Sequence, residues 1–189
     1  MTRTRVDAVR NRASVLQATA ELLAKDGAAA LRVADVAAVA GVGAGTIYRG
    51  FGSKSGLLLA LLDERERVLQ EALIRGDPPL GPGASAEERL VAFVLALHDL
   101  TLAERDVIVA SERSATSRYE TGAYRAWHAH AALLLREAGV PDPPTSAHTL
   151  LAPLDAGLYR HLVDDGGIDA QRIRDALGRS VRTLASVTA

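Results

Sequence analysis

The stretch from Arg32 to Leu57, RVADVAAVAGVGAGTIYRGFGSKSGL, predicts two short helices joined by a tight turn. One buried face of the first helix follows the i, i+3, i+4, i+7 spacing, with Val33, Val36, Ala37 and Ala40. Gly41 comes next, where a left-handed backbone is needed to turn the chain. In the second helix Ile47 and Phe51 stand four residues apart and are expected to point inward. This helix-turn-helix pattern holds out a second helix that fits the DNA major groove, so it predicts sequence-specific DNA binding.

The same stretch resembles the signature of the TetR family of bacterial transcriptional regulators. The matching residues are Ala40, Gly41, Val42, Gly45, Thr46, Ile47, Tyr48, Phe51, Ser53, Lys54 and Leu57. The resemblance implies a helix-turn-helix DNA-binding domain at residues 1–55 and a helical ligand-binding and dimerisation domain at residues 56–189. An ordinary helical hairpin with a glycine turn is the alternative interpretation of the motif.

The resemblance also implies a recognition helix over residues 44–50. Its expected DNA-contacting positions are Arg32, Gly43, Ala44, Gly45, Thr46, Tyr48, Arg49 and Lys54. Arg49 is the candidate for reading guanine, because a guanidinium can bind both acceptors of that base; a solvated or phosphate-bound arginine is the alternative. Tyr48 is expected to bond a phosphate through its hydroxyl, with packing between helices as the alternative.

Several residues depart from the family pattern. Arg32 stands where a capping threonine or serine is usual, so the following helix has either no side-chain cap or an arginine that reaches a phosphate. Gly43 replaces a usual serine, and Gly50 replaces an aromatic residue or histidine. Glycine inside a helix costs about 1 kcal/mol relative to alanine, so the recognition helix is expected to be intrinsically weak.

Charge is distributed unevenly along the chain. The 189 residues carry a net charge of −1, but residues 1–60 hold eight basic and four acidic side chains, and the remainder is correspondingly acidic. A basic end on an otherwise acidic protein is the electrostatic pattern of a DNA-reading module. Arg3 and Arg5, ahead of the first expected helix, are candidates for an adjacent minor groove.

Composition excludes several other classes. There is no cysteine, so disulfides and thiolate metal sites are ruled out. His128 and His130 diverge on a helix and cannot share an ion, so neither a metal nor another cofactor is expected. The sequence has no nucleophile turn or phosphate loop, which argues against an enzyme. With no signal-peptide-like or membrane-spanning apolar run, we expect a cytoplasmic protein.

Apolar periodicity predicts an all-α chain. Helices are expected at residues 7–25, 53–75 and 86–100, in shorter pieces over 103–115, and at 121–138, 146–164 and 169–187. The first is expected to bury Val9, Ala13, Leu16, Ala20 and Leu23. Residues 76–85 and the segment PDPPTS at 141–146 are expected breaks.

The last two expected helices carry apolar stripes. These are Leu151, Leu154, Leu158 and Leu162 on one, and Ile173, Leu177, Val181 and Leu184 on the other. Two such helices from each of two chains would form a four-helix bundle, so they are the predicted homodimer surface; completing the monomer core is the alternative. The resemblance further implies an effector cavity between residues 85 and 164, with candidate contacts His98, Tyr124, Trp127, His128, Asp155 and Tyr159.

These expectations imply a ligand-responsive repressor. As a homodimer it would bind a palindromic operator in double-stranded DNA, and a small hydrophobic effector would release it. Two alternatives stay open. One is a dimeric small-molecule-binding or adaptor protein whose glycine-rich reading helix no longer binds DNA. The other is an activator on the same scaffold.

Overall fold

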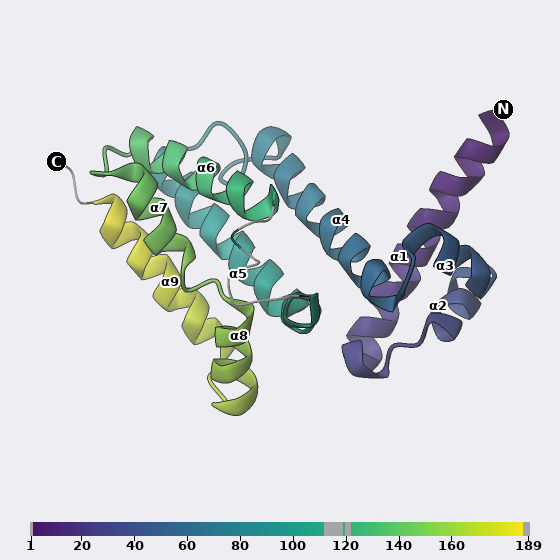
Figure 1. The fold of residues 1–189 in the computed structure, drawn as a ribbon. Coiled ribbons are helices and arrows are strands. Elements are labelled where there is room, and N and C mark those ends of the chain that lie inside the picture. The colour runs from purple at the N-terminus through teal and green to yellow at the C-terminus, as the bar shows by residue number, and fades with distance from the viewer. Residues whose placement is uncertain (1, 112–118, 120–121, 187–189) are drawn as a thin grey trace. The chain divides into compact units, whose positions relative to one another are not determined.

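The computed structural model describes residues 2–111, 119 and 122–186, with the side chains from residue 7 onward except those of 110 and 111. Every regular element among these residues is a helix (Figure 1), which confirms the all-α fold. The chain divides into two compact units, Met1–Arg65 and Glu66–Ala189. The division falls within α4 (Lys54–Arg75), later than the sequence-based boundary after residue 55, because the apolar start of α4 belongs to the first unit.

The first unit contains α1 (Thr2–Ala30), α2 (Val33–Ala40), α3 (Ala44–Phe51) and the start of α4. Its buried side chains come from all four helices and from the α1–α2 connection: Val15, Leu16, Ala18, Thr19, Leu31, Val33, Val36, Ala37, Ile47, Leu57, Leu58, Ala60 and Leu61. The predicted helix-turn-helix is therefore confirmed as a packed three-helix module with α4 added to it.

The turn between α2 and α3 is built on Gly41. Its backbone is left-handed, with φ 67° and ψ 32°, as the sequence predicted. The amide of Val42 donates to the carbonyl of Ala37 at 3.0 Å, which satisfies one carbonyl at the end of α2. A side chain at this φ would be strained, so glycine lets the chain turn directly into α3.

The predicted apolar face of the first helix is wrong at its start. Val9 is 66% exposed and Ala13 is also exposed, whereas burial begins at Val15 and Leu16. Figure 1 shows the first turns of α1 extending beyond α2 and α3. The helix breaks at Gly27, where φ is +77°, close to the predicted end.

The second unit contains α5 (Ala86–Ser111), α6 (Gly122–Glu137), α7 (Pro143–Leu151), α8 (Ala156–Tyr159), the π-helical segment η2 (Arg160–Asp165) and α9 (Ala170–Ala185). The predicted face of α5 is confirmed, because Leu90, Phe93, Val94 and Leu97 are all buried. They form one core with side chains of the other helices, including Trp127, Leu134, Leu151, Tyr159 and Val181.

The predicted helical pieces over 103–115 and the predicted break over 141–146 are both wrong. α5 continues without interruption through Ser111, so residues 103–111 are not separate pieces, and 112–115 lie outside the described residues. Pro143 and Pro144 begin α7 instead of extending a break, because the first helical turn needs no proline N–H.

The helix expected over 146–164 is divided after Leu151. Pro153 has no N–H to continue the helical hydrogen bonds, and Asp155 starts α8 by accepting from the amide of Leu158 at 2.8 Å. The interruption turns Leu158 away from its expected stripe, leaving it 39% exposed. Among the described helices, none is long and apolar enough to cross a membrane.

Candidate nucleic-acid interface

The candidate recognition helix is α3, which is held by one buried face. Ile47 is 1% exposed and anchors α3 in the first unit, while Phe51 is only partly buried. Gly43 occupies the N-cap position with extended backbone and no side-chain cap, and Gly52 follows the last residue. The absence of a side-chain cap and the glycines at 45 and 50 agree with the expectation of an intrinsically weak helix.

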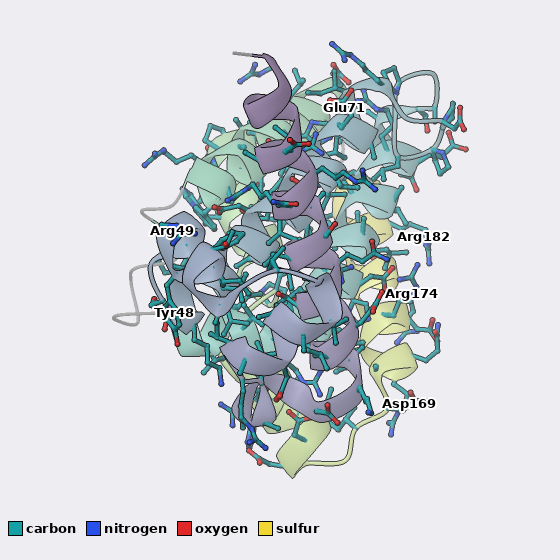
Figure 2. The ribbon with its side chains drawn as sticks, turned by 90° about the vertical axis from the view of Figure 1, so that its right-hand side faces the viewer. Tyr48, Arg49, Glu71, Asp169, Arg174 and Arg182 are labelled. Atoms are coloured by element: carbon teal, nitrogen blue, oxygen red, sulfur yellow. The ribbon has the colours of Figure 1, made fainter. Side chains whose placement is uncertain are left out.

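Tyr48 and Arg49 lie on the outer face of this helix, and Figure 2 shows their side chains pointing outward. Tyr48 is 53% exposed, so packing between helices is not its role in this structure. Arg49 is exposed as well. Among the described side chains, no carboxylate lies within ion-pair distance of Arg49.

Arg49 folds back along its own helix. Its Nη2 donates to Oγ1 of Thr46 at 3.1 Å, one turn earlier. The guanidinium also lies over Gly45, where a Cβ atom would stand 3.6 Å from Nη1. Sequence analysis named these three positions separately, and the structure brings them together on one exposed surface.

The two remaining cations of the predicted set are partly engaged elsewhere. Arg32 provides no side-chain cap to α2, and its Nε lies 3.6 Å from Oδ2 of Asp35 on the exposed surface. Lys54 Nζ donates to the carbonyl of Ala29 at 3.5 Å, near the end of α1. A cation there satisfies one of the terminal helix carbonyls and interacts favourably with the helix dipole.

Arg12, which no sequence motif singled out, contacts α3. Its guanidinium lies 4.9 Å from the ring centroid of Phe51, within the range of a cation–π interaction. This contact ties α1 to the last turn of α3. No local pattern could have indicated it, because the two residues meet only in the tertiary fold. Arg3 and Arg5, suggested for the minor groove, lie outside the described side chains.

The predicted effector contacts fall into separate places in the second unit. His98 and Tyr159 form a buried pair, with His98 Nδ1 2.7 Å from the Tyr159 hydroxyl. Burial lowers the pKa of His98 and raises the pKa of Tyr159 above its usual range. The phenol therefore keeps its proton and the imidazole is neutral. Nε2 of His98 lies 3.9 Å from Oδ1 of Asp99, and this carboxylate favours the tautomer with its proton on Nε2, in which Nδ1 accepts from the phenol.

Tyr124 and His128 belong to a second cluster, on α6 and α7. The Tyr124 hydroxyl lies 2.8 Å from Nδ1 of His148, and the rings of His128 and His148 are centred 4.0 Å apart. His128 Nε2 donates to the carbonyl of Pro144 at 3.0 Å. Sequence analysis did not include His148, whose stacking against His128 depends on the packing of α6 on α7.

The other two candidates have structural positions. Trp127 is 8% exposed and its ring is centred 6.1 Å from that of Phe93 in the core. Asp155 caps α8, as described above. The six predicted effector contacts thus comprise a buried pair, two members of a ring cluster and two residues with structural positions. Among the described residues, no group of three or more histidine or acidic side chains could hold a metal ion.

A separate apolar groove of about 840 Å³ runs between α7, η2 and α9. Its apolar walls are Leu150, Pro153, Leu162, Ile168, Ile173, Leu177, Val181 and Leu184. Arg172, Asp175 and Arg179 add charges at the same groove. None of the predicted effector contacts lines it. Four residues of the stripe predicted on the last helix do: Ile173, Leu177, Val181 and Leu184.

A packed three-helix module, with an exposed helix following a left-handed glycine turn, defines the helix-turn-helix class. Residues 15–61 match the family model described as bacterial regulatory proteins, tetR family. The HTH-type transcriptional repressor LfrR of Mycolicibacterium smegmatis is 37% identical over 93 residues, which are 49% of this chain and 48% of LfrR. This match therefore spans about half the length of that relative.

Two solved structures are similar over most of the chain. A TetR-family transcriptional regulator from Rhodococcus sp. is 25% identical with a TM-score of 0.68, covering 94% of this chain and 100% of that one. A transcriptional regulator from Saccharomonospora viridis in complex with choline is 25% identical with a TM-score of 0.67, covering 90% and 94%. Residues 15–61 therefore form the N-terminal domain of the tetR family of bacterial regulatory proteins, and the chain is similar to TetR-family regulators over most of its length.

Proposed function

We propose that this protein regulates transcription by placing α3 in the major groove of double-stranded DNA. The observation that carries the proposal is the outer face of α3, where Tyr48 and Arg49 are exposed on a helix that is anchored from behind by Ile47. An exposed helix of this kind, in a family of regulatory proteins, has the chemistry and dimensions needed to reach base edges.

In this proposal each residue of the interface has a specific role in binding DNA. Arg49 reads a guanine through two N–H groups, and Tyr48 donates its hydroxyl to a phosphate. Gly43, Ala44 and Gly45 let the start of α3 approach the backbone closely, because glycine and alanine add little bulk. Arg32 and Lys54 supply charges that attract phosphates without reading sequence.

The protein is proposed to act as a homodimer, because a single helix-turn-helix reads too few base pairs to select a site. The groove between α7, η2 and α9 supports this step, because its partly buried wall residues Leu162, Ile173 and Leu184 leave apolar surface accessible on the last helices. Leu177 and Val181 of the same groove complete the core of the monomer. Across a two-fold axis, Asp175 of one copy would face arginines of the other, Arg172 or Arg179. A dimer of this kind would hold two copies of α3 for the two halves of a palindrome.

Repression relieved by a small effector is the proposed mode of regulation. LfrR is named as a repressor. A different similar protein, from Saccharomonospora viridis, was solved in complex with choline. One similar protein is thus a repressor and another binds a small molecule. Effector binding would favour one of two states of the dimer and lower its affinity for DNA. A hydrophobic effector is proposed from composition, because the chain is rich in aliphatic residues and only 4% of its residues are aromatic.

Selection of fragmented genomic DNA from the source organism by the purified protein tests this proposal. The best fragment is then measured by fluorescence anisotropy at two salt concentrations. A discrete palindromic site with affinity that falls steeply as salt rises is the expected result. Arg49→Ala should weaken binding to that site by about 1–3 kcal/mol, with Tyr48→Phe as a milder variant.

Weak binding spread over all fragments would overturn the DNA-reading proposal. The dimeric ligand-binding or adaptor function would then take its place. If a site is found, transcription from the adjacent promoter with and without the protein separates a repressor from an activator.

A further inference from the structure

The hydrogen bond from Arg49 Nη2 to Thr46 Oγ1, at 3.1 Å, fixes an arginine that would otherwise be free. Arg49 is exposed, and no carboxylate among the described side chains pairs with its charge. A long exposed side chain ordinarily samples many rotamers, and ordering it on binding costs free energy. Here a single neutral acceptor on the same helix holds the guanidinium before any partner arrives.

We propose that Thr46 is a positioning residue that sets the guanidinium of Arg49 for base reading. This inference rests on the proposed DNA-binding function and adds the source of its selectivity. Thr46 acts through Arg49: its hydroxyl takes one of the five N–H groups of the guanidinium and leaves the others for the two acceptors of guanine.

The identity of the neighbouring residues fits this arrangement. Gly45 has no side chain, and the guanidinium lies across the open space above it, 3.6 Å from where a Cβ atom would be. A neutral hydroxyl is also better suited than a carboxylate. It orients the guanidinium without neutralising the charge, whereas an ion pair would compete with the DNA for the arginine. Thr46 and Arg49 are one turn apart, so the geometry is set within α3 itself.

The experiment starts with selection from a random duplex library by the wild-type protein. The best site is then compared with the same site carrying one substituted guanine, at each guanine in turn. The ratio of the two dissociation constants measures discrimination at that base. Four variants are compared with the wild type: Thr46→Val, which keeps the shape but removes the acceptor, Thr46→Ser, which keeps the hydroxyl, Arg49→Ala, and the double variant Thr46→Val with Arg49→Ala.

At the guanine where Arg49→Ala abolishes discrimination, Thr46→Val is expected to reduce discrimination by about three- to tenfold, which corresponds to freeing one ordered side chain. Thr46→Ser should stay within about twofold of the wild type. In the Arg49→Ala background, Thr46→Val should cause no further loss, because its effect passes through the arginine. The slope of affinity against salt should be the same for Thr46→Val and the wild type.

A second measurement needs no DNA. In the free protein, NMR relaxation of the Arg49 guanidinium should show greater mobility in Thr46→Val than in the wild type or Thr46→Ser. Two results would overturn this inference while leaving the proposed DNA-binding function intact. One is unchanged base discrimination in Thr46→Val. The other is a loss of affinity from Thr46→Val that is equal at every base and is the same with Arg49 or with alanine at position 49. A wild-type protein that selects no sequence overturns the proposed function itself, which distinguishes the two failures.

Discussion

Tyr159, fully buried on α8, donates a 2.7 Å hydrogen bond to Nδ1 of His98 on α5. The pair lies where the short α8 packs on the long α5, and its outer neighbour Asp99 is bonded in turn by Arg174 of α9. A polar chain thus runs from the core of the second unit to its surface. Two consequences of this arrangement can be measured.

Tyr159→Phe should lower the free energy of unfolding by about 1–3 kcal/mol, because it leaves Nδ1 of His98 buried without a partner. Urea denaturation followed by the fluorescence of Trp127, the single tryptophan of the chain, reports on the same core. Tyr48→Phe is the matched control: this phenol is 53% exposed, so the change should stay within about 0.5 kcal/mol. Equal losses in the two variants would contradict the role of the buried bond.

Stability should fall as the pH is lowered through the range of the histidines. Burial lowers the pKa of His98 and of His130 from the ordinary value of 6.5. Below about pH 6.5 the unfolded chain therefore binds protons that the folded chain does not. The stability present above this pH is lost as the pH falls toward the folded pKa values, by at most about 1.4 kcal/mol per pH unit for each histidine.

Urea denaturation at a series of pH values measures this slope. His130→Leu should flatten it. The pKa values of Glu88 and Asp164 are also lowered, by the hydrogen bonds from Ser85 and from Arg105. These carboxylates lose their charge only in more acidic solution. If His130→Leu does not change how the free energy of unfolding varies with pH, the pH dependence arises from another titratable group.

The glycines of α3 predict opposite effects on stability and on DNA binding. A Cβ atom at Gly50 would meet nothing within 4 Å, and one at Gly45 would stand at an ordinary contact distance of 3.6 Å from Nη1 of Arg49, so alanine fits at both positions. Gly45→Ala and Gly50→Ala should each stabilise the first unit by about 1 kcal/mol, measured by hydrogen exchange of its amides. Of these two variants only Gly45→Ala should weaken DNA binding in the proposed complex, because Gly45 lies at the start of α3 beside the Arg49 guanidinium, whereas Gly50 has no assigned contact with the DNA. If Gly45→Ala binds DNA with the same affinity as the wild type, glycine is not required at position 45.

The apolar groove of the second unit predicts a homodimer that a single charged substitution in the groove should separate into monomers. Ile173 and Leu184 are partly buried residues of its walls. Leu184→Glu should convert a dimer into a monomer, because a buried carboxylate at an apolar interface has no partner. Light scattering with size-exclusion chromatography measures the mass. Leu133→Glu, on an α6 side chain that is 43% exposed and outside the groove, should stay dimeric. A monomeric wild type would exclude the groove as a stable interface.

Local rules predicted the parts of the fold that depend on neighbouring residues. The left-handed turn at Gly41, the end of α4 at Arg75 and the buried face of α5 follow from glycine conformation and apolar spacing. The start of α1 failed for a physical reason: periodicity shows which face could be buried, but not how far the neighbouring helices extend. Pro153 shows the opposite error, since a sequence signal for a break was present beneath a regular leucine spacing.

The candidate site was predictable in composition but not in its contacts. The sequence named Thr46 and Arg49, or His98 and Tyr159, as separate candidates, and the structure shows each as a hydrogen-bonded pair. Partners within one helical turn could have been inferred from their spacing. His98 and Tyr159 are 61 residues apart, and Arg12 meets Phe51 from another helix, so only the packed chain reveals these contacts.

Gly43 and Gly50 have ordinary backbone angles, and a Cβ atom at either position would meet no neighbouring atom within 4 Å. They stand at the beginning and near the end of α3, so they bracket the exposed surface without supporting the fold beneath it. A library randomised at these two positions would vary the surface while leaving Ile47 and the core in place. The feature that weakens this helix thus also makes the protein a scaffold from which new DNA specificities can be engineered.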